Sequence, residues 1–154
     1  MSNTYILDTG ILMGYLRAAP YAEYLESTFP FSQSFVVTSI VSIGELYAIA
    51  FRRGWGEAKV NKLAEIIKVI VPIDISDPNI VEKYGEIDAY NCGKHLTKKL
   101  PKGMSDRKMS DNDIWIAATG AVLKATLLTT DKDFDHLNKI FLDVVHIEHT
   151  LRAK

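Results

Sequence analysis

The chain has 154 residues, and its 18 lysines and arginines nearly balance 19 aspartates and glutamates, which leaves a formal net charge of −1. Hydrophobic residues make up 47% of the chain, a proportion that excludes an intrinsically disordered protein. The length predicts a single domain spanning residues 1–154, and the charge balance excludes nucleic-acid binding driven by a global positive field.

The single cysteine, Cys92, excludes an intramolecular disulfide and any cysteine-based zinc site. The first residues show no basic, apolar secretion signal, and no apolar run reaches the roughly 20 residues of a membrane helix. We therefore expect a cytoplasmic protein without membrane contact.

Strand and helix patterns alternate along the chain. Short apolar runs predict buried strands at residues 4–7, 35–38, 69–73, 125–129 and 143–146. Helical spacing of apolar residues predicts helices at residues 41–53, 57–68, 78–99 and 110–124. Parallel strands need long crossovers, so this order predicts an α/β fold, a central parallel sheet of about five strands with helices on both faces.

Ligands bind such sheets at the carboxyl ends of the strands. Asp8 directly follows the first predicted strand and Asp131 follows the fourth, although an aspartate there can also simply cap the next helix. Glu45 is the only charged residue between Thr38 and Phe51, in a helix that is apolar nearly all round. We expect that helix to be buried and its carboxylate to need a cation or several donors.

The helix at residues 110–124 supplies a further acidic residue. Ser110 and Asp113 have the spacing of a capping box, which is a structural alternative to a catalytic role. The helical face through Asp113 continues with small residues such as Ala117 and Gly120, which would let the helix lie close to the sheet. Asp111 and Asp133 are additional candidates beside the main acidic positions.

Carboxylates gathered in one crevice repel one another unless cations neutralise them. Magnesium or manganese suits an all-oxygen site, and the four histidines show no metal-ligand spacing. Metal ions held by an acidic cluster are suited to hydrolysis of phosphodiester bonds.

Four short motifs occur in order along the chain: Leu7-Asp8-Thr9, Glu45-Leu46, Asp113-x-x-Ile116-Ala117-Ala118-Thr119, and Thr129-Thr130-Asp131-x-Asp133-Phe134. Together they resemble the motifs of PIN-domain nucleases, especially VapC-type ribonuclease toxins, over essentially the whole chain. The resemblance implies a PIN-like fold and metal-dependent RNA cleavage that leaves a 5′-phosphate and a 3′-hydroxyl. It also implies a homodimer, a cognate antitoxin, and a Mg²⁺- or Mn²⁺-binding site formed by Asp8, Glu45, Asp113 and Asp131.

Two glycines depart from the family pattern. Gly10 stands where family members commonly have asparagine, and Gly120 stands where they commonly have alanine. The missing side chain at position 10 removes a polar group from the neighbourhood of the site, which puts the metal affinity in question.

Two basic stretches are candidates for RNA binding. The first is formed by Lys94, Lys98, Lys99, Lys102, Arg107 and Lys108, and the second includes Arg52 and Arg53. An ordinary solvated surface is the alternative for both stretches.

Two other functions remain open. A catalytically silent module could keep the fold for binding, although none of the four acids has been lost. A phosphatase could use Asp8 as a nucleophile, but haloacid-dehalogenase-like enzymes place a second aspartate where this chain has Gly10.

Overall fold

The computed structural model describes residues 3–149. Its five strands form one sheet in the order β3-β2-β1-β4-β5, and every neighbouring pair is parallel. The strands are β1 (Thr4–Leu7), β2 (Phe35–Ser39), β3 (Val71–Ile73), β4 (Thr126–Thr129) and β5 (Asp143–His146). The predicted α/β fold with a central parallel sheet is confirmed.

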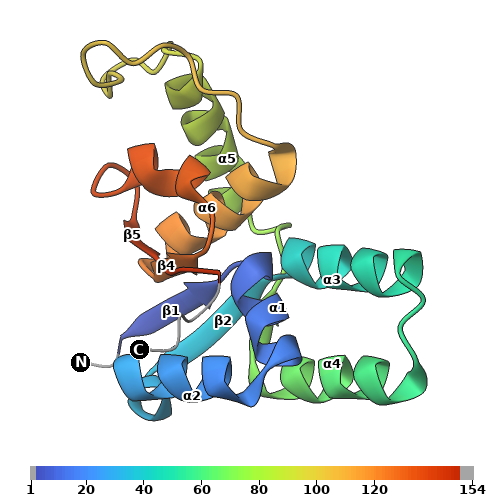
Figure 1. Ribbon diagram of the computed structural model, residues 1–154. Helices are drawn as coiled ribbons and strands as arrows, with labels where there is room; N and C mark the ends of the chain where they lie inside the picture. The colour runs from blue at the N-terminus through green and yellow to red at the C-terminus, as the bar shows by residue number, and fades with distance from the viewer. Residues whose placement is uncertain (1–2, 150–154) are drawn as a thin grey trace.

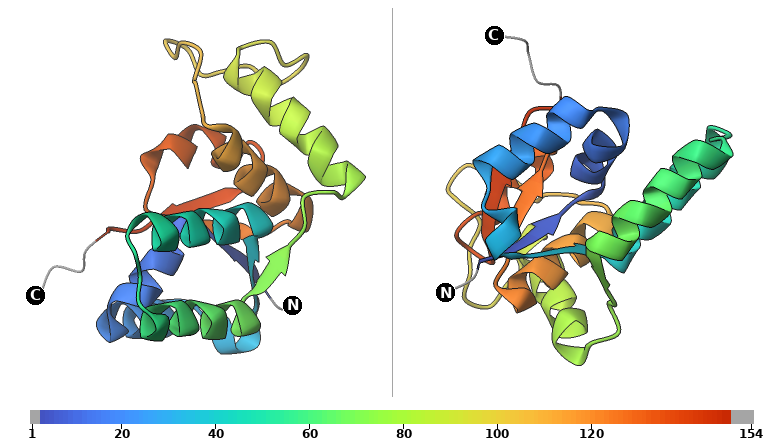
Figure 2. Two further views of the ribbon diagram at one scale, coloured as in Figure 1. Left: turned by 90° about the vertical axis from the view of Figure 1, so that its right-hand side faces the viewer. Right: turned by 90° about the horizontal axis from the view of Figure 1, so that it is seen from below.

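Helices cover both faces of this sheet (Figure 1). They are α1 (Thr9–Arg17), α2 (Ala19–Thr28), α3 (Ile40–Arg52), α4 (Glu57–Val69), α5 (Pro78–Asn91) and α6 (Asp111–Leu123), with short 3₁₀ helices η1 (Phe31–Gln33) and η2 (Lys132–Leu137). In Figure 1, α5 and α6 lie above the sheet and α2 and α4 lie below it, while α3 and α4 extend to one side, as Figure 2 also shows.

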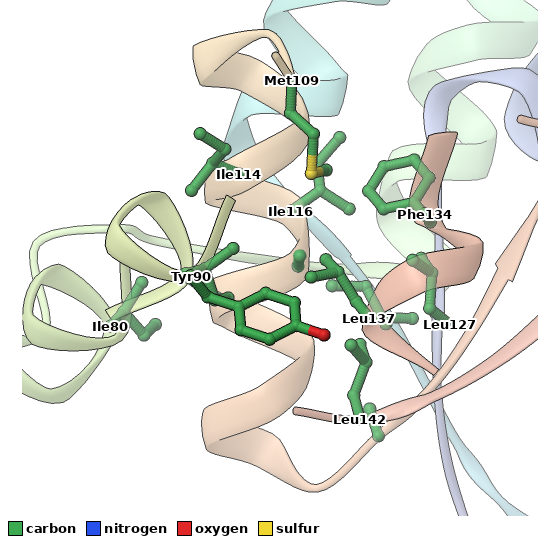
Figure 3. Packing of buried hydrophobic residues seen from close by; sticks show 14 of the residues in the cluster. Ile80, Tyr90, Met109, Ile114, Ile116, Leu127, Phe134, Leu137 and Leu142 are labelled. Carbon is green, nitrogen blue, oxygen red and sulfur yellow. The ribbon is translucent and has the colours of Figure 1, made fainter. Parts of the chain in front are cut away.

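Alternation along the strands divides the core into two clusters. Ile6 and Leu127 face α5 and α6, whereas their neighbours Leu7 and Leu128 face α1 and α2. This is the period-two pattern of a strand that is buried on both faces. Figure 3 shows the first cluster, in which the ring of Tyr90 lies among side chains from α6, β4 and η2.

Helix α6 packs closely against the sheet. A Cβ atom added to Gly120 would lie 2.9 Å from Leu142 Cδ1 and 3.1 Å from Ile6 Cγ2. The predicted close approach of this helix is therefore confirmed, and it fixes the direction in which the start of α6 points.

The predicted extent of the helix beginning at Pro78 is wrong, because α5 ends at Asn91 instead of near residue 99. Gly93 adopts a left-handed conformation with φ of 69°, and the Lys94 amide donates to the Ala89 carbonyl at 2.8 Å, which closes the helix. Residues 92–110 consequently form a long loop. Its end is held where the Arg107 amide donates to the Asn91 carbonyl at 2.8 Å.

The chain order creates a crevice between β1 and β4. The connections from β1 lead through α1 and α2 to β2, whereas β4 is reached from β3 through α5 and α6 on the opposite face. The Asp8 amide donates to the Leu128 carbonyl at 3.2 Å, so the ends of the two strands lie side by side. Loops that diverge at such a point leave room for a ligand.

None of the helices within residues 3–149 combines the length and apolar character needed to cross a bilayer.

The packing of α1 against α2 yields a stability prediction. A Cβ atom at Gly14 would lie 2.3 Å from Cε1 of the buried Tyr21 ring, whereas one at Gly44, in the middle of α3, would meet nothing within 4 Å. Gly14→Ala should lower the free energy of unfolding by about 1–3 kcal/mol through overpacking. Gly44→Ala should raise it by up to about 1 kcal/mol through helix propensity.

Urea unfolding of both variants beside the parent chain measures the two effects. Equal changes in the free energy of unfolding of both variants would show that the packing against Tyr21 does not require a glycine at position 14.

Candidate active site

Asp8 is the most deeply buried of the predicted acidic residues, with only 5% of its surface exposed. It is the N-cap of α1, because its Oδ1 accepts a hydrogen bond from the Ile11 amide at 3.1 Å. Its Oδ2 accepts a hydrogen bond from the Thr129 hydroxyl of β4. Both carboxylate oxygens are therefore oriented by the fold, one by a helix and the other by the neighbouring strand.

Asp131 lies beyond β4 and is tied to the same threonine. Its amide donates to Thr129 Oγ1 at 2.9 Å, and its own Oδ1 accepts from the Asp133 amide at 2.8 Å as the N-cap of η2. Thr129 thus joins the two strand-end aspartates.

Asp113 occupies the first turn of α6. Ser110 is the N-cap of this helix, and its hydroxyl accepts a hydrogen bond from the Asp113 amide at 3.2 Å. The Asp113 amide therefore takes part in the predicted helix cap. The Asp113 side chain has a separate position, because it lines a cavity that Asp8 also lines.

Glu45 reaches the same cavity from the second turn of α3, where its Oε1 accepts a hydrogen bond from the Thr9 hydroxyl at 2.9 Å. The expectation that α3 is buried all round is wrong. Phe51 is 77% exposed and Ile40 is 42% exposed, and Glu45 itself is half-buried. The helix runs out beyond the sheet (Figure 2), so its outer side has no partner within residues 3–149.

The four acids predicted from the sequence line one cavity of about 290 Å³ at the carboxyl ends of β1 and β4. The complete set of lining residues is Asp8, Thr9, Gly10, Glu45, Asp113, Ile116, Thr130, Asp131, Lys132 and His149.

The cavity is electrostatically unbalanced. Burial raises the pKa of Asp8 from 3.8 to about 6, against the opposing effect of its hydrogen bonds and with a smaller contribution from the Asp131 charge. Burial also raises the pKa of Asp113 to about 6, and the charges of Asp131, Glu45 and Asp8 add to it. In the described part of the chain, no lysine or arginine forms an ion pair with any of these four carboxylates. The cluster favours either a bound cation or a proton.

The other acidic candidates lie outside the cavity wall. Asp111 accepts a hydrogen bond from the Tyr84 hydroxyl at 2.9 Å, and the exposed Asp133 side chain is not among the lining residues.

The two basic stretches lie apart from each other. The six cations between residues 94 and 108 belong to the loop above α5 in Figure 1, and none lines the acidic cavity. Arg52 and Arg53 lie at the end of α3, and each lines a separate groove that adjoins the cavity.

Three threonines were not predicted as site residues. Thr9 binds Glu45, Thr129 binds Asp8, and Thr130 lies on the cavity wall. A Cβ atom at Gly10 would lie 2.3 Å from Thr130 Oγ1, so the Thr130 hydroxyl fills the space beside position 10. The Thr130 hydroxyl therefore provides a polar group close to the position where Gly10 has no side chain. The signal that could have identified these residues is their position beside Asp8 and Asp131.

The donor set fits a hard divalent cation. The cavity offers carboxylate and hydroxyl oxygens, and its buried Asp8 carboxylate has no cationic partner within residues 3–149. In the structure, no three acidic, histidine or cysteine side chains of those residues are spaced to enclose an ion, and Asp8, Glu45, Asp113 and Asp131 are the residues that would hold it.

The sheet and its carboxylate-lined crevice define an α/β domain with an acidic centre at the strand ends. The sequence model of the PIN domain matches residues 5–140. The chain therefore belongs to the PIN domain family.

Solved structures with a similar fold come from several bacteria. One is VapBC2 from Rickettsia felis bound to a DNA fragment from its promoter, with a TM-score of 0.73, 22% identity, and coverage of 94% of this chain and 99% of that chain. Another is VapBC-1 from nontypeable Haemophilus influenzae, with a TM-score of 0.66, 26% identity, and coverage of 93% and 97%. No curated protein sequence matches the chain.

The raised pKa of Asp8 predicts how stability depends on pH. Between pH 3.8 and about 6 the folded state keeps a proton that the unfolded state releases, so this contribution is complete below pH 3.8 and is lost as the pH rises through about 6. Asp8→Asn keeps the cap and removes the charge. Without divalent metal it should therefore stabilise the chain near neutral pH by on the order of 2–3 kcal/mol, but not at about pH 4.

Thermal unfolding in chelator at both pH values measures this difference. Asp74→Asn is the control of opposite sign, because hydrogen bonds from Ser76 lower the pKa of the exposed Asp74 and its charge stabilises the folded state at neutral pH. An Asp8→Asn variant that is no more stable than the parent chain at neutral pH would contradict the assigned charge imbalance.

Proposed function

We propose that this PIN-domain chain is a metal-dependent endoribonuclease that hydrolyses RNA phosphodiester bonds. The observation that carries the proposal is the meeting of Asp8, Glu45, Asp113 and Asp131 on one cavity. Lys132 also lines this cavity, but within residues 3–149 none of the four carboxylates forms an ion pair. Such a cluster can hold Mg²⁺ or Mn²⁺, and its exposed mouth can admit a phosphate group.

The hydrogen bonds of the chain prepare these acids for such a role. Thr129 orients Asp8, and Thr9 orients Glu45 across the gap between α1 and α3. Ser110 fixes the first turn of α6 and with it the direction of Asp113. Bound Mg²⁺ or Mn²⁺ would supply an activated water and neutralise the charge that develops on the leaving oxygen.

The structure does not favour Asp8 as the nucleophile of a phosphatase. One Asp8 oxygen caps α1 and the other accepts from Thr129, so both are engaged in orienting the strand end. Hydrogen bonds to both oxygens lower the nucleophilicity of the carboxylate, whereas they leave a lone pair on each oxygen with which it can bind a metal ion.

The similar structures support a second part of the proposal, that the chain acts as the toxin of a toxin–antitoxin pair in the cytoplasm. They include a toxin–antitoxin complex from Klebsiella pneumoniae and VapBC-5 from Mycobacterium tuberculosis. We propose a cognate antitoxin as protein partner. An apolar groove of about 520 Å³ between α2, α4 and the starts of β2 and β3 offers a surface for it, with Phe35 and Val69 among its exposed side chains.

Cleavage of RNA by purified protein tests the enzymatic proposal. The parent chain should cut total cellular RNA with Mg²⁺ or Mn²⁺ and not with chelator, and the new ends should carry 5′-phosphates. Asp8→Asn and Asp113→Asn should each lower the rate by about 100-fold or more. Removing a group that hydrogen-bonds to a metal ligand typically costs about 10- to 100-fold, and removing the ligand itself should cost at least as much.

Asp111→Asn and Asp133→Asn are the matched controls, since both remove a nearby carboxylate that does not line the cavity. Unchanged cleavage in the Asp8 or Asp113 variant would refute the assigned site. RNA binding by a parent chain that cuts no RNA with either metal would instead favour a silent binding module.

We also propose that the chain forms a homodimer through the outer side of α3. Ile40, Gly44 and Phe51 are exposed along this side, and the half-buried Tyr47 lies between them at helical spacing. Phe51 is 77% exposed. Phe51→Asp should convert the dimer to a monomer in analytical ultracentrifugation without altering the fold. The control is Leu96→Asp, which places the same charge at a 97% exposed position of the loop at residues 92–110. A Phe51→Asp chain that remains dimeric would exclude α3 as the interface.

A further inference from the structure

A second groove opens directly beside the acidic cavity. It lies between α1, the start of α2 and the end of α3, has a volume of about 440 Å³, and shares Gly10 and His149 with the cavity wall. An extended ligand bound at the carboxylates can therefore continue directly into this groove.

The charge of this groove is opposite to that of the cavity. Arg17, from the last turn of α1, and Arg53, at the C-cap of α3, both line it, and no carboxylate does. Neither arginine forms an ion pair with an acid of residues 3–149. Two exposed guanidinium groups without acidic partners form a binding surface for an anion.

The floor of the groove is apolar and open. Met13, Tyr21 and Ile49 contribute carbon surface, and Met13 and Tyr21 are themselves buried in the core behind it. Gly10, Gly14 and Ala18 also line the groove, and the Tyr21 ring covers Gly14, so the floor is formed by carbon atoms and not by polar groups of α1. An apolar floor beneath a cationic rim matches a nucleotide, which has a flat base and an anionic phosphate.

We propose that this groove, which we call the arginine groove, binds a nucleotide of single-stranded RNA adjacent to the bond cut in the acidic cavity. Arg17 and Arg53 bind the phosphodiester, and the base rests on Met13 and Ile49. His149, at the junction of the two hollows, contacts the phosphate between them. The inference rests on the proposed function and adds a binding site that supplies the attraction the acidic cavity lacks.

The test is RNA binding by the full chain, measured by fluorescence anisotropy with a short labelled single-stranded RNA of random sequence in the presence of chelator. The double variant Arg17→Ala/Arg53→Ala should bind at least about tenfold more weakly at low salt. The slope of log affinity against log salt should fall by about 0.7, because the two arginines neutralise one phosphate and each phosphate neutralised on a single strand contributes about 0.7. Arg17→Lys/Arg53→Lys should keep most of the slope.

The matched control is Lys68→Ala/Lys124→Asn, which removes two positive charges that line neither hollow. Its affinity and slope should stay close to those of the parent chain. Equal losses in the control and the arginine variant, or an unchanged slope in the latter, would overturn the proposal. So would a parent chain that binds an acidic peptide but not RNA, since the groove would then hold a protein segment.

Cleavage assays separate this inference from the proposed function. Loss of RNA binding in the arginine variant, with no metal-dependent cleavage by the parent chain, would support the groove and refute the nuclease. Cleavage by the parent chain with undiminished binding by the arginine variant would support the nuclease and refute the groove.

Discussion

The burial of the Asp8 carboxylate at the end of β1 is the constraint on which the rest of the site depends. A charged group with only 5% exposure is costly, and its pKa near 6 reflects that cost. The fold offsets part of it with two hydrogen bonds, from the Ile11 amide and the Thr129 hydroxyl. The remainder favours a proton or a cation in the cavity. The same carboxylate therefore starts α1, joins β1 to β4 and creates the local demand for positive charge.

Capping and function are not alternatives in this molecule. Asp8 caps α1 and Asp131 caps η2, and both carboxylates still line the acidic cavity. Ser110 caps α6 so that the neighbouring Asp113 faces the same space. Helix N-termini carry partial positive charge, so this arrangement moderates the repulsion among the carboxylates without neutralising it. Helix capping is a structural alternative to a catalytic role when each aspartate is considered alone. Here the capping interactions also bring the carboxylates together in one cavity.

The sequence was sufficient where local pattern determines position. Alternating strands and helices predicted the parallel sheet, and the strand-end rule led to Asp8 and Asp131.

The sequence was insufficient where the outcome depends on pairing between distant segments. Thr129 meets Asp8 because β1 and β4 pair with Leu7 opposite Leu128, a register that neither segment reveals alone. The end of α5 was misjudged because apolar spacing continues past Asn91, whereas the left-handed Gly93 ends the helix. The burial of α3 was misjudged because apolar composition does not show whether a partner is present.

The spatial distribution of charge explains how a net charge of −1 is compatible with an RNA-cutting role. Four carboxylates gather at the strand ends, and two arginines without acidic partners in residues 3–149 line the next groove. At a distance the 18 positive and 19 negative charges of the whole chain nearly cancel, so the protein has no long-range field that would draw any RNA toward it. Close to the surface, each group of charges acts over the screening length of about 10 Å, so both signs act locally. Under the proposed function, discrimination among RNAs would therefore depend on which strands can place a base on the apolar floor while a phosphate reaches the carboxylates. Such a requirement selects for RNA that is already single-stranded, because a paired base cannot enter the groove.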